Sequence, residues 1–117
     1  MKLNTVAEVE LIDGTKVECT LTYRALLQLS TKAKDAYDEY NRIFTKGAKT
    51  EIDNLRIVYT AYLCAWVLAE KPVSHALTFD DFIDNLIPDR VMVQGALATL
   101  LNPKKATASA APSSAAV

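Results

Sequence analysis

The sequence predicts an α+β fold, mostly helical, in which an N-terminal β-hairpin packs on a bundle of two long and two shorter helices. Three observations predict it. Apolar and polar residues alternate over residues 5–21, the hydrophobic period lengthens to that of a helix over 22–45, and residues 50–70 are a second helical segment rich in apolar residues. The 117 residues are enough for one domain. We expect it to span residues 1–102, followed by a flexible tail, 103–117.

The hairpin is predicted from two runs with a period of two. In the first run, Ala7, Val9 and Leu11 alternate with glutamates, and a similar run follows the turn. Asp13-Gly14 supplies the positive φ that a tight hairpin turn requires. A two-stranded hairpin is marginal in water by itself, so the helices that follow must cover its apolar face.

Two long helices are predicted next. Residues 22–45 read as one amphipathic helix capped by Thr22, with Ser30-Thr31 as weak helix formers in its middle, where a bend is one option. A second helix starts at Thr50, which has Asp53 three residues on as in a capping box, and runs to about residue 70.

The second half of this helix, residues 57–69, is apolar almost all round. Such a stretch lies at the centre of a structure or is covered by a second copy of it. Either the C-terminal helices fold over it or another chain does, and both options stay open. Tyr59, Tyr62 and Trp66 accordingly belong either to a self-association surface or to the core.

Two shorter helices complete the predicted domain. Thr78 caps a helix over residues 79–86 whose first turn is acidic, as the helix dipole favours. Pro88 precedes a last helix that ends near Asn102. Residues 103–117 contain six Ala, three Ser and two Pro, a composition with nothing to anchor it.

No catalytic or metal-binding set of residues is apparent, and we expect no cofactor. The only histidine, His75, lies beside Ser74, and adjacent side chains rarely face each other as nucleophile and base. Cys19 and Cys64 lie far apart without metal-ligand spacing, so we expect both to be reduced core residues. We therefore expect a binding protein, not an enzyme.

Charge and hydropathy exclude two classes of partner. A net charge of −1 leaves no basic face for nucleic acid and no reason to expect an anionic membrane surface. The longest uncharged run, residues 57–69, is shorter than the ~20 residues that cross a bilayer. The chain starts without a signal-peptide pattern, and a cytoplasmic location fits.

Two segments carry a resemblance to a known family. The hairpin leading into Leu21–Leu29, and the segment Leu77–Leu86 followed by Pro88-Asp89, together with the apolar second helix, resemble the tail assembly chaperones of long-tailed phages and prophages of Gram-positive bacteria. The resemblance covers most of residues 3–102 and is carried by patterns of helix and strand residues.

The resemblance implies a function in tail morphogenesis. Such chaperones coat the tape measure protein, keep it soluble in the host cytoplasm, help recruit tail tube subunits, self-associate, and are absent from the mature virion. They are often made in two forms by ribosomal frameshifting. Pro103-Lys104-Lys105 is compatible with a slippery A-AAA-AAG heptamer, and AAG at codon 104 would exclude it.

For the partner-binding surface we expect an apolar groove flanked by charges, which accepts helix faces. The predicted contributors are Phe79, Phe82, Ile83 and Leu86. The alternative for these residues is a lid packed over Trp66. The alternative functions are another small phage morphogenesis protein, such as a head–tail connector or a tail completion protein, and a bacterial dimeric adaptor.

Overall fold

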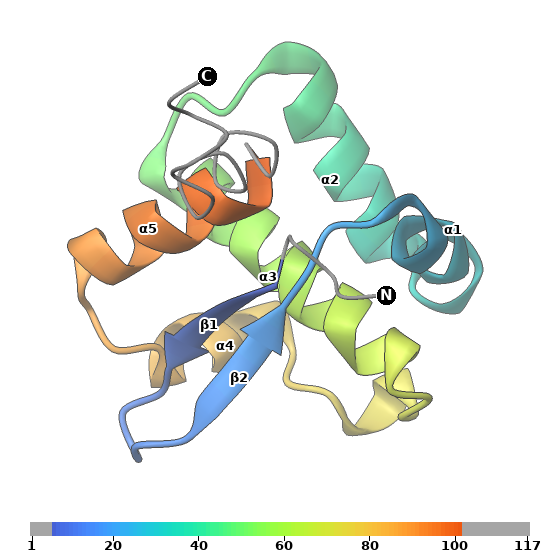
Figure 1. Ribbon diagram of the computed structural model, residues 1–117. Helices are drawn as coiled ribbons and strands as arrows, with labels where there is room; N and C mark the ends of the chain where they lie inside the picture. The colour runs from blue at the N-terminus through green and yellow to red at the C-terminus, as the bar shows by residue number, and fades with distance from the viewer. Residues whose placement is uncertain (1–5, 102–117) are drawn as a thin grey trace, which may run out of the picture.

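The computed structural model describes residues 6–101. The predicted fold class is confirmed, because this part of the chain is mostly helical with an N-terminal antiparallel hairpin (Figure 1). The predicted tail, including Pro103-Lys104-Lys105, lies outside the described residues. The elements are, in order, β1 (Ala7–Glu10), β2 (Lys16–Cys19), α1 (Tyr23–Lys32), α2 (Lys34–Lys46), α3 (Glu51–Leu68), the 3₁₀ helix η1 (Val73–His75), α4 (Phe79–Asn85) and α5 (Arg90–Leu101).

The predicted hairpin is present and has the predicted apolar face. Val9 pairs with Val17, and Gly14 in the turn has a φ of 89°. The side chains of Val9 and Cys19 are fully buried because β2 packs on α3 and β1 packs on α5. The helices thus cover the apolar face, and the charged residues of both strands remain on the other face.

The single helix predicted over residues 22–45 is instead two helices, and that prediction was wrong. The chain breaks at Ala33, where φ is −146° and ψ is 66°. Just before the break, the hydroxyls of Ser30 and Thr31 donate to the carbonyls of Leu27 and Gln28. Such back-bonding competes with the helical backbone ladder and bends helices. The break lets α1 and α2 pack against each other and against α3.

Helix α3 lies at the centre of the molecule (Figure 1). It contacts α1, α2, β2, α4, α5 and η1, so the chain itself covers the apolar stretch, and most of residues 57–67 are buried. The predicted N-cap is present, since the Thr50 side chain accepts from the N–H of Asp53. Of the two options for this stretch, the structure shows the one in which the chain's own elements fold over it.

The connection between α4 and α5 is fastened to the hairpin. Leu86, just past α4, forms an antiparallel bridge with Leu11. The N–H of Ile12 donates to the carbonyl of Asn85 (2.7 Å), and the N–H of Ile87 donates to that of Glu10 (3.1 Å). These bonds cover the C-terminal end of the outer edge of β1.

Candidate protein-binding surface

The predicted aromatic residues of α3 pack together in and beside the core. Tyr62 is buried, whereas Tyr59 and Trp66 are half-buried and pack against the core. The hydroxyl of Tyr59 donates to the carbonyl of Leu77 (2.8 Å), and the Tyr62 hydroxyl accepts from the N–H of the same residue (3.0 Å). Burial raises the pKa of Tyr59 to about 12, so this hydroxyl stays protonated and keeps its hydrogen bond.

The predicted partner-binding residues around α4 divide into two groups. Phe82 and Leu86 are buried, while Phe79 and Ile83 are half-buried. The ring of Phe82 stacks on Tyr62 with centroids 5.3 Å apart. In this packing α4 is a lid over the tyrosines of α3. Phe82 and Leu86 therefore offer no surface to a partner, and only Phe79 and Ile83 remain partly accessible.

The nucleophilic and metal-binding side chains are not gathered into a site. Cys19 and Cys64 are free and buried, and burial raises the pKa of each thiol to about 12, which keeps both protonated at neutral pH. His75 is exposed in η1. Across residues 6–101, no group of three or more His, Cys, Asp and Glu residues could hold a metal ion.

An apolar groove lies where α1, α2 and the end of α5 meet, and we call it the α1–α2 groove. It encloses about 360 Å³. Of the described residues that line it, none is charged. Its lining residues are Leu21, Tyr23, Leu26, Leu27, Tyr37, Tyr40, Asn41, Phe44, Leu100 and Leu101.

The large hydrophobic side chains that the described chain leaves exposed are concentrated at this groove. Tyr23 is 87% exposed, Leu27 67%, Phe44 66% and Leu101 41%, and these four are half of the eight exposed large hydrophobic residues. Contiguous exposed apolar surface of this kind marks sites of protein interaction. The α1–α2 groove is therefore the candidate functional site of the described chain.

The sequence prediction missed the groove because it treated residues 22–45 as one amphipathic helix and placed the partner-binding surface at α4. Of the apolar stripe along residues 22–45, Leu29 and Ile43 are buried in the core, whereas Tyr23, Leu27 and Phe44 are exposed. The signal was present in the sequence, because the apolar residues of 22–45 form a stripe wider than one buried helix face needs.

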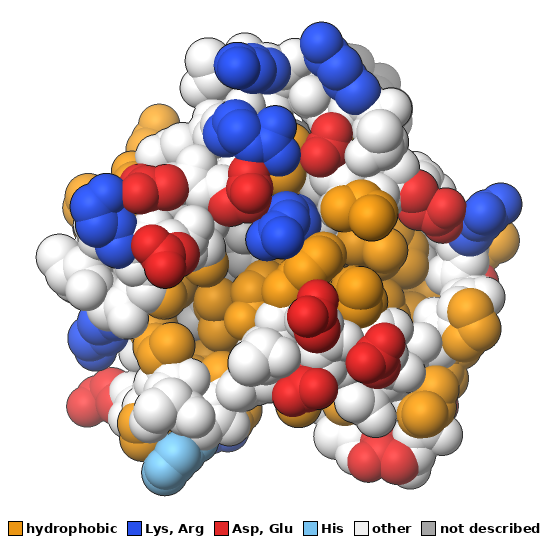
Figure 2. Space-filling view, turned by 180° about the vertical axis from the view of Figure 1, so that it is seen from behind, with side chains coloured by type: hydrophobic (Ala, Val, Ile, Leu, Met, Phe, Trp, Pro, Cys, Tyr) orange, Lys and Arg blue, Asp and Glu red, His pale blue; other side chains and the backbone are white. Residues whose placement is uncertain are grey.

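The opposite face carries a second hollow. Figure 2 shows hydrophobic side chains gathered in a depression, with basic and acidic side chains above it and acidic ones below. A cavity of about 730 Å³ opens between α2, α3, η1 and α4, and Tyr59, Phe79 and Arg56 are among its lining residues. The Arg56 guanidinium lies 4.1 Å from the centre of the Phe79 ring. Its large apolar side chains are at most half exposed, so it presents less apolar surface than the α1–α2 groove.

Comparison of the chain with protein-family models, with curated proteins and with solved structures finds no match. Among residues 6–101 there is no helix with the length and apolar character needed to span a membrane.

Proposed function

We propose that this protein is a phage tail assembly chaperone, which binds and solubilises the tape measure protein in the host cytoplasm and helps recruit tail tube subunits. The α1–α2 groove is the observation that carries the proposal, because a chaperone for a long amphipathic helix needs an accessible apolar site. The resemblance supports it as well. Leu21–Leu29, one of the two segments that resemble the family, supplies Tyr23, Leu26 and Leu27 to a wall of the groove.

The spacing of the wall residues suits a helix as occupant. Tyr37, Tyr40 and Phe44 follow one another along α2 at i, i+3 and i+7, and Tyr23, Leu26 and Leu27 do so along α1 at i, i+3 and i+4. At a rise of ~1.5 Å per residue, the wall on α2 is about 10 Å long, or two helical turns. A client helix would lay two turns of its apolar face into the groove.

The size of the groove favours weak single contacts. Its exposed side chains offer on the order of 500 Å², below the ~800 Å² that each partner buries in a standard protein interface. Many copies along one tape measure protein would bind by avidity, and each copy could leave as tail tube subunits polymerise. Self-association of the chaperone and its absence from the mature virion are part of the same proposal.

The test is co-expression with the tape measure protein of the same phage, followed by pull-down. One variant carries Tyr23→Ser, Leu27→Ser and Phe44→Ser. Its matched control carries Ile12→Ser, Ile52→Ser and Val91→Ser, which are 61%, 56% and 82% exposed and do not line the groove. We expect the unaltered protein and the control to keep the client soluble, and the groove variant to lose most of that effect.

Two results would contradict the proposal in different ways. If the unaltered protein leaves the client insoluble, the chaperone function fails. If the groove variant solubilises the client as well as the control does, the chaperone acts through another surface, and the hollow beside Phe79 is tested next. Detection of the protein in purified virions would favour a head–tail connector or tail completion protein, and a gene far from any phage genes would favour a bacterial adaptor.

A further inference from the structure

The two edges of the hairpin differ in what covers them. The C-terminal end of the outer edge of β1 is bonded to the α4–α5 connection, through the Glu10 carbonyl and the N–H of Ile12 just beyond the strand. On β2, the N–H of Thr20 donates to the carbonyl of Ala61 in α3 (3.0 Å), so the far end of that edge is also covered. Between the turn and Thr20, the outer edge of β2 is not covered by any described element of the chain.

The hydrogen-bond pattern shows which groups point to that open edge. The N–H of Leu11 donates to the carbonyl of Thr15, so Val17, two residues further on, also bonds inward to β1. Lys16 and Glu18 therefore direct their N–H and C=O groups outward, as Thr20 does. Within residues 6–101 the outward N–H and C=O groups of Lys16 and Glu18 have no hydrogen-bond partner, and both residues are exposed.

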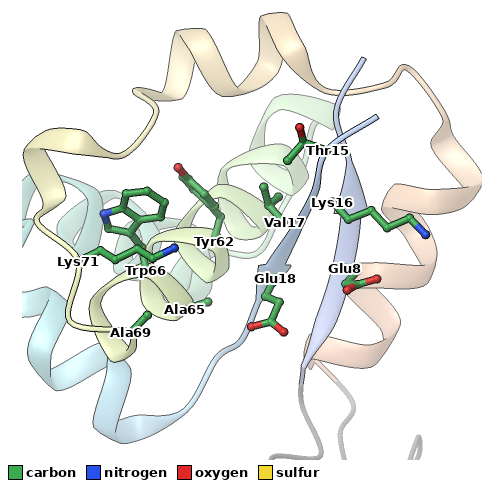
Figure 3. Close-up of a pocket in the computed structure, with 10 residues that line it drawn as sticks. All are labelled: Glu8, Thr15, Lys16, Val17, Glu18, Tyr62, Ala65, Trp66, Ala69 and Lys71. Carbon is green, nitrogen blue, oxygen red and sulfur yellow. The ribbon is translucent and has the colours of Figure 1, made fainter. Parts of the chain in front are cut away.

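A hollow lies beside β2. It encloses about 440 Å³ between Thr15–Glu18 and the C-terminal half of α3. In Figure 3 the side chain of Val17 points toward Tyr62, and Trp66 and Lys71 stand on the far side of the hollow. The indole N–H of Trp66 donates to the Pro72 carbonyl (2.7 Å), and the Lys71 ammonium lies 4.6 Å from the ring centre. The hollow thus combines a strand edge with an anchored aromatic wall.

We propose that the open edge of β2 binds an extended segment of a partner protein, which adds to the hairpin as an antiparallel third strand centred opposite Val17. Unpaired strand edges bind extended peptides in this way. The charges define the segment: a basic residue faces Glu18, an apolar residue faces Val17 and turns toward Trp66 and Tyr62, and an acidic residue faces Lys16. Opposite charges directly across strands stabilise such pairing.

A single strand suits the site better than the hairpin of a second copy. The open edge runs only from Lys16 to Glu18, because the N–H of the next outward-facing residue, Thr20, already donates to the Ala61 carbonyl in α3. Trp66 and Lys71 stand across the hollow from β2 and so bound the space beside this edge. The inference is independent of the α1–α2 groove and of the proposed chaperone function.

The test uses peptides and the full-length protein, with backbone amides followed by NMR. The probe has the sequence of residues 14–20 with Cys19→Ser, because an antiparallel alignment places its Lys opposite Glu18 and its Glu opposite Lys16. The control peptide has the Lys and Glu exchanged, which brings like charges together. We expect saturable shifts at the amides of Lys16 and Glu18, and roughly tenfold weaker binding of the exchanged peptide.

A second pair of peptides tests the backbone hydrogen bonds without altering the protein. N-methylation of the probe at its Glu removes an N–H that points to β2, whereas N-methylation at its Val alters an N–H that points away. The first modification should abolish binding and the second should preserve it. The protein with the three groove substitutions should bind the probe unchanged.

Three results would overturn the inference: no shifts at the β2 edge, equal binding of the exchanged peptide, or equal effects of the two N-methylations. Shifts of the Lys16 and Glu18 amides on raising the protein concentration alone would also overturn it, since the occupant would then be a second copy. None of these results bears on solubilisation of the tape measure protein.

Discussion

At the scale of single residues, exposure separates side chains that the sequence alone makes look equivalent. Phe82 and Phe44 both lie on apolar helix faces, yet Phe82 is fully buried and Phe44 is 66% exposed. Burial requires a partner surface from elsewhere in the chain. The rings of Tyr59 and Tyr62 in α3 provide one for Phe82, whereas the ring of Phe44 stacks on Tyr40, one turn away on its own helix, with ring centroids 5.7 Å apart.

This difference predicts that replacing each Phe by Ala destabilises the fold to very different extents. Phe82→Ala should lower the free energy of unfolding by about 3–5 kcal/mol, because it leaves a cavity beside Tyr59 and Tyr62. Phe44→Ala should lower it by no more than about 1 kcal/mol, because its ring is mostly in water already. Urea unfolding of the two variants measures both, and equal losses would contradict the packing of α4 described above.

One residue-level expectation agrees with the structure, and a second question was left open by the sequence. Cys19 and Cys64 were expected as reduced core residues, and both are free and buried. Tyr62 could be assigned to neither the core nor a self-association surface from the sequence. Its place was decided by α4, a segment whose position no local pattern specifies.

At the scale of elements, helix starts were predictable because their signals are local. Thr22, Thr50 and Thr78 were each expected as N-caps, and each side chain accepts from the N–H three residues on. The break at Ala33 was not predicted as a helix end, because no proline or glycine marks it. The Ser30 and Thr31 hydroxyls back-bond just before it, and the two helices that it separates both pack on α3.

The threonine N-caps of α3 and α4 lead to a second prediction. Thr50→Ala and Thr78→Ala should each lower the free energy of unfolding by about 1 kcal/mol, since each leaves a helix N-terminus without its side-chain acceptor. Thr45→Ala, at an exposed position in the last turn of α2, is the matched control and should change it by less than about 0.5 kcal/mol. A cap variant as stable as the control would show that water replaces the threonine hydroxyl without loss.

At the scale of the whole molecule, the sequence predicted the class of fold but left the cover of α3 undecided. The apolar stretch of residues 57–69 could not by itself reveal whether its cover came from the same chain. For the same reason, the sequence could not show which helices come together to form the candidate site. The groove is built by α1, α2 and α5, and its walls face one another only because the chain breaks at Ala33.

The closed core predicts that folding requires no second copy. We expect the circular dichroism signal of the helices to stay unchanged on dilution to a concentration at which light scattering reports a single chain. The reason is that α3 is already surrounded by elements of its own chain. Loss of helicity on dilution would mean that association stabilises the fold, as in obligate oligomers.

Because β1 is bonded to the α4–α5 connection, the hairpin is synthesised well before the residues that complete its packing. The hairpin leaves the ribosome first, but the residues that cover its outer edge, 85–87, and the helix that packs on β1 come last. At about 5–20 residues per second, several seconds separate the two. During that interval the growing chain exposes the apolar side chains of Val9 and Leu11, so a chain stalled before α5 would itself need protection from aggregation.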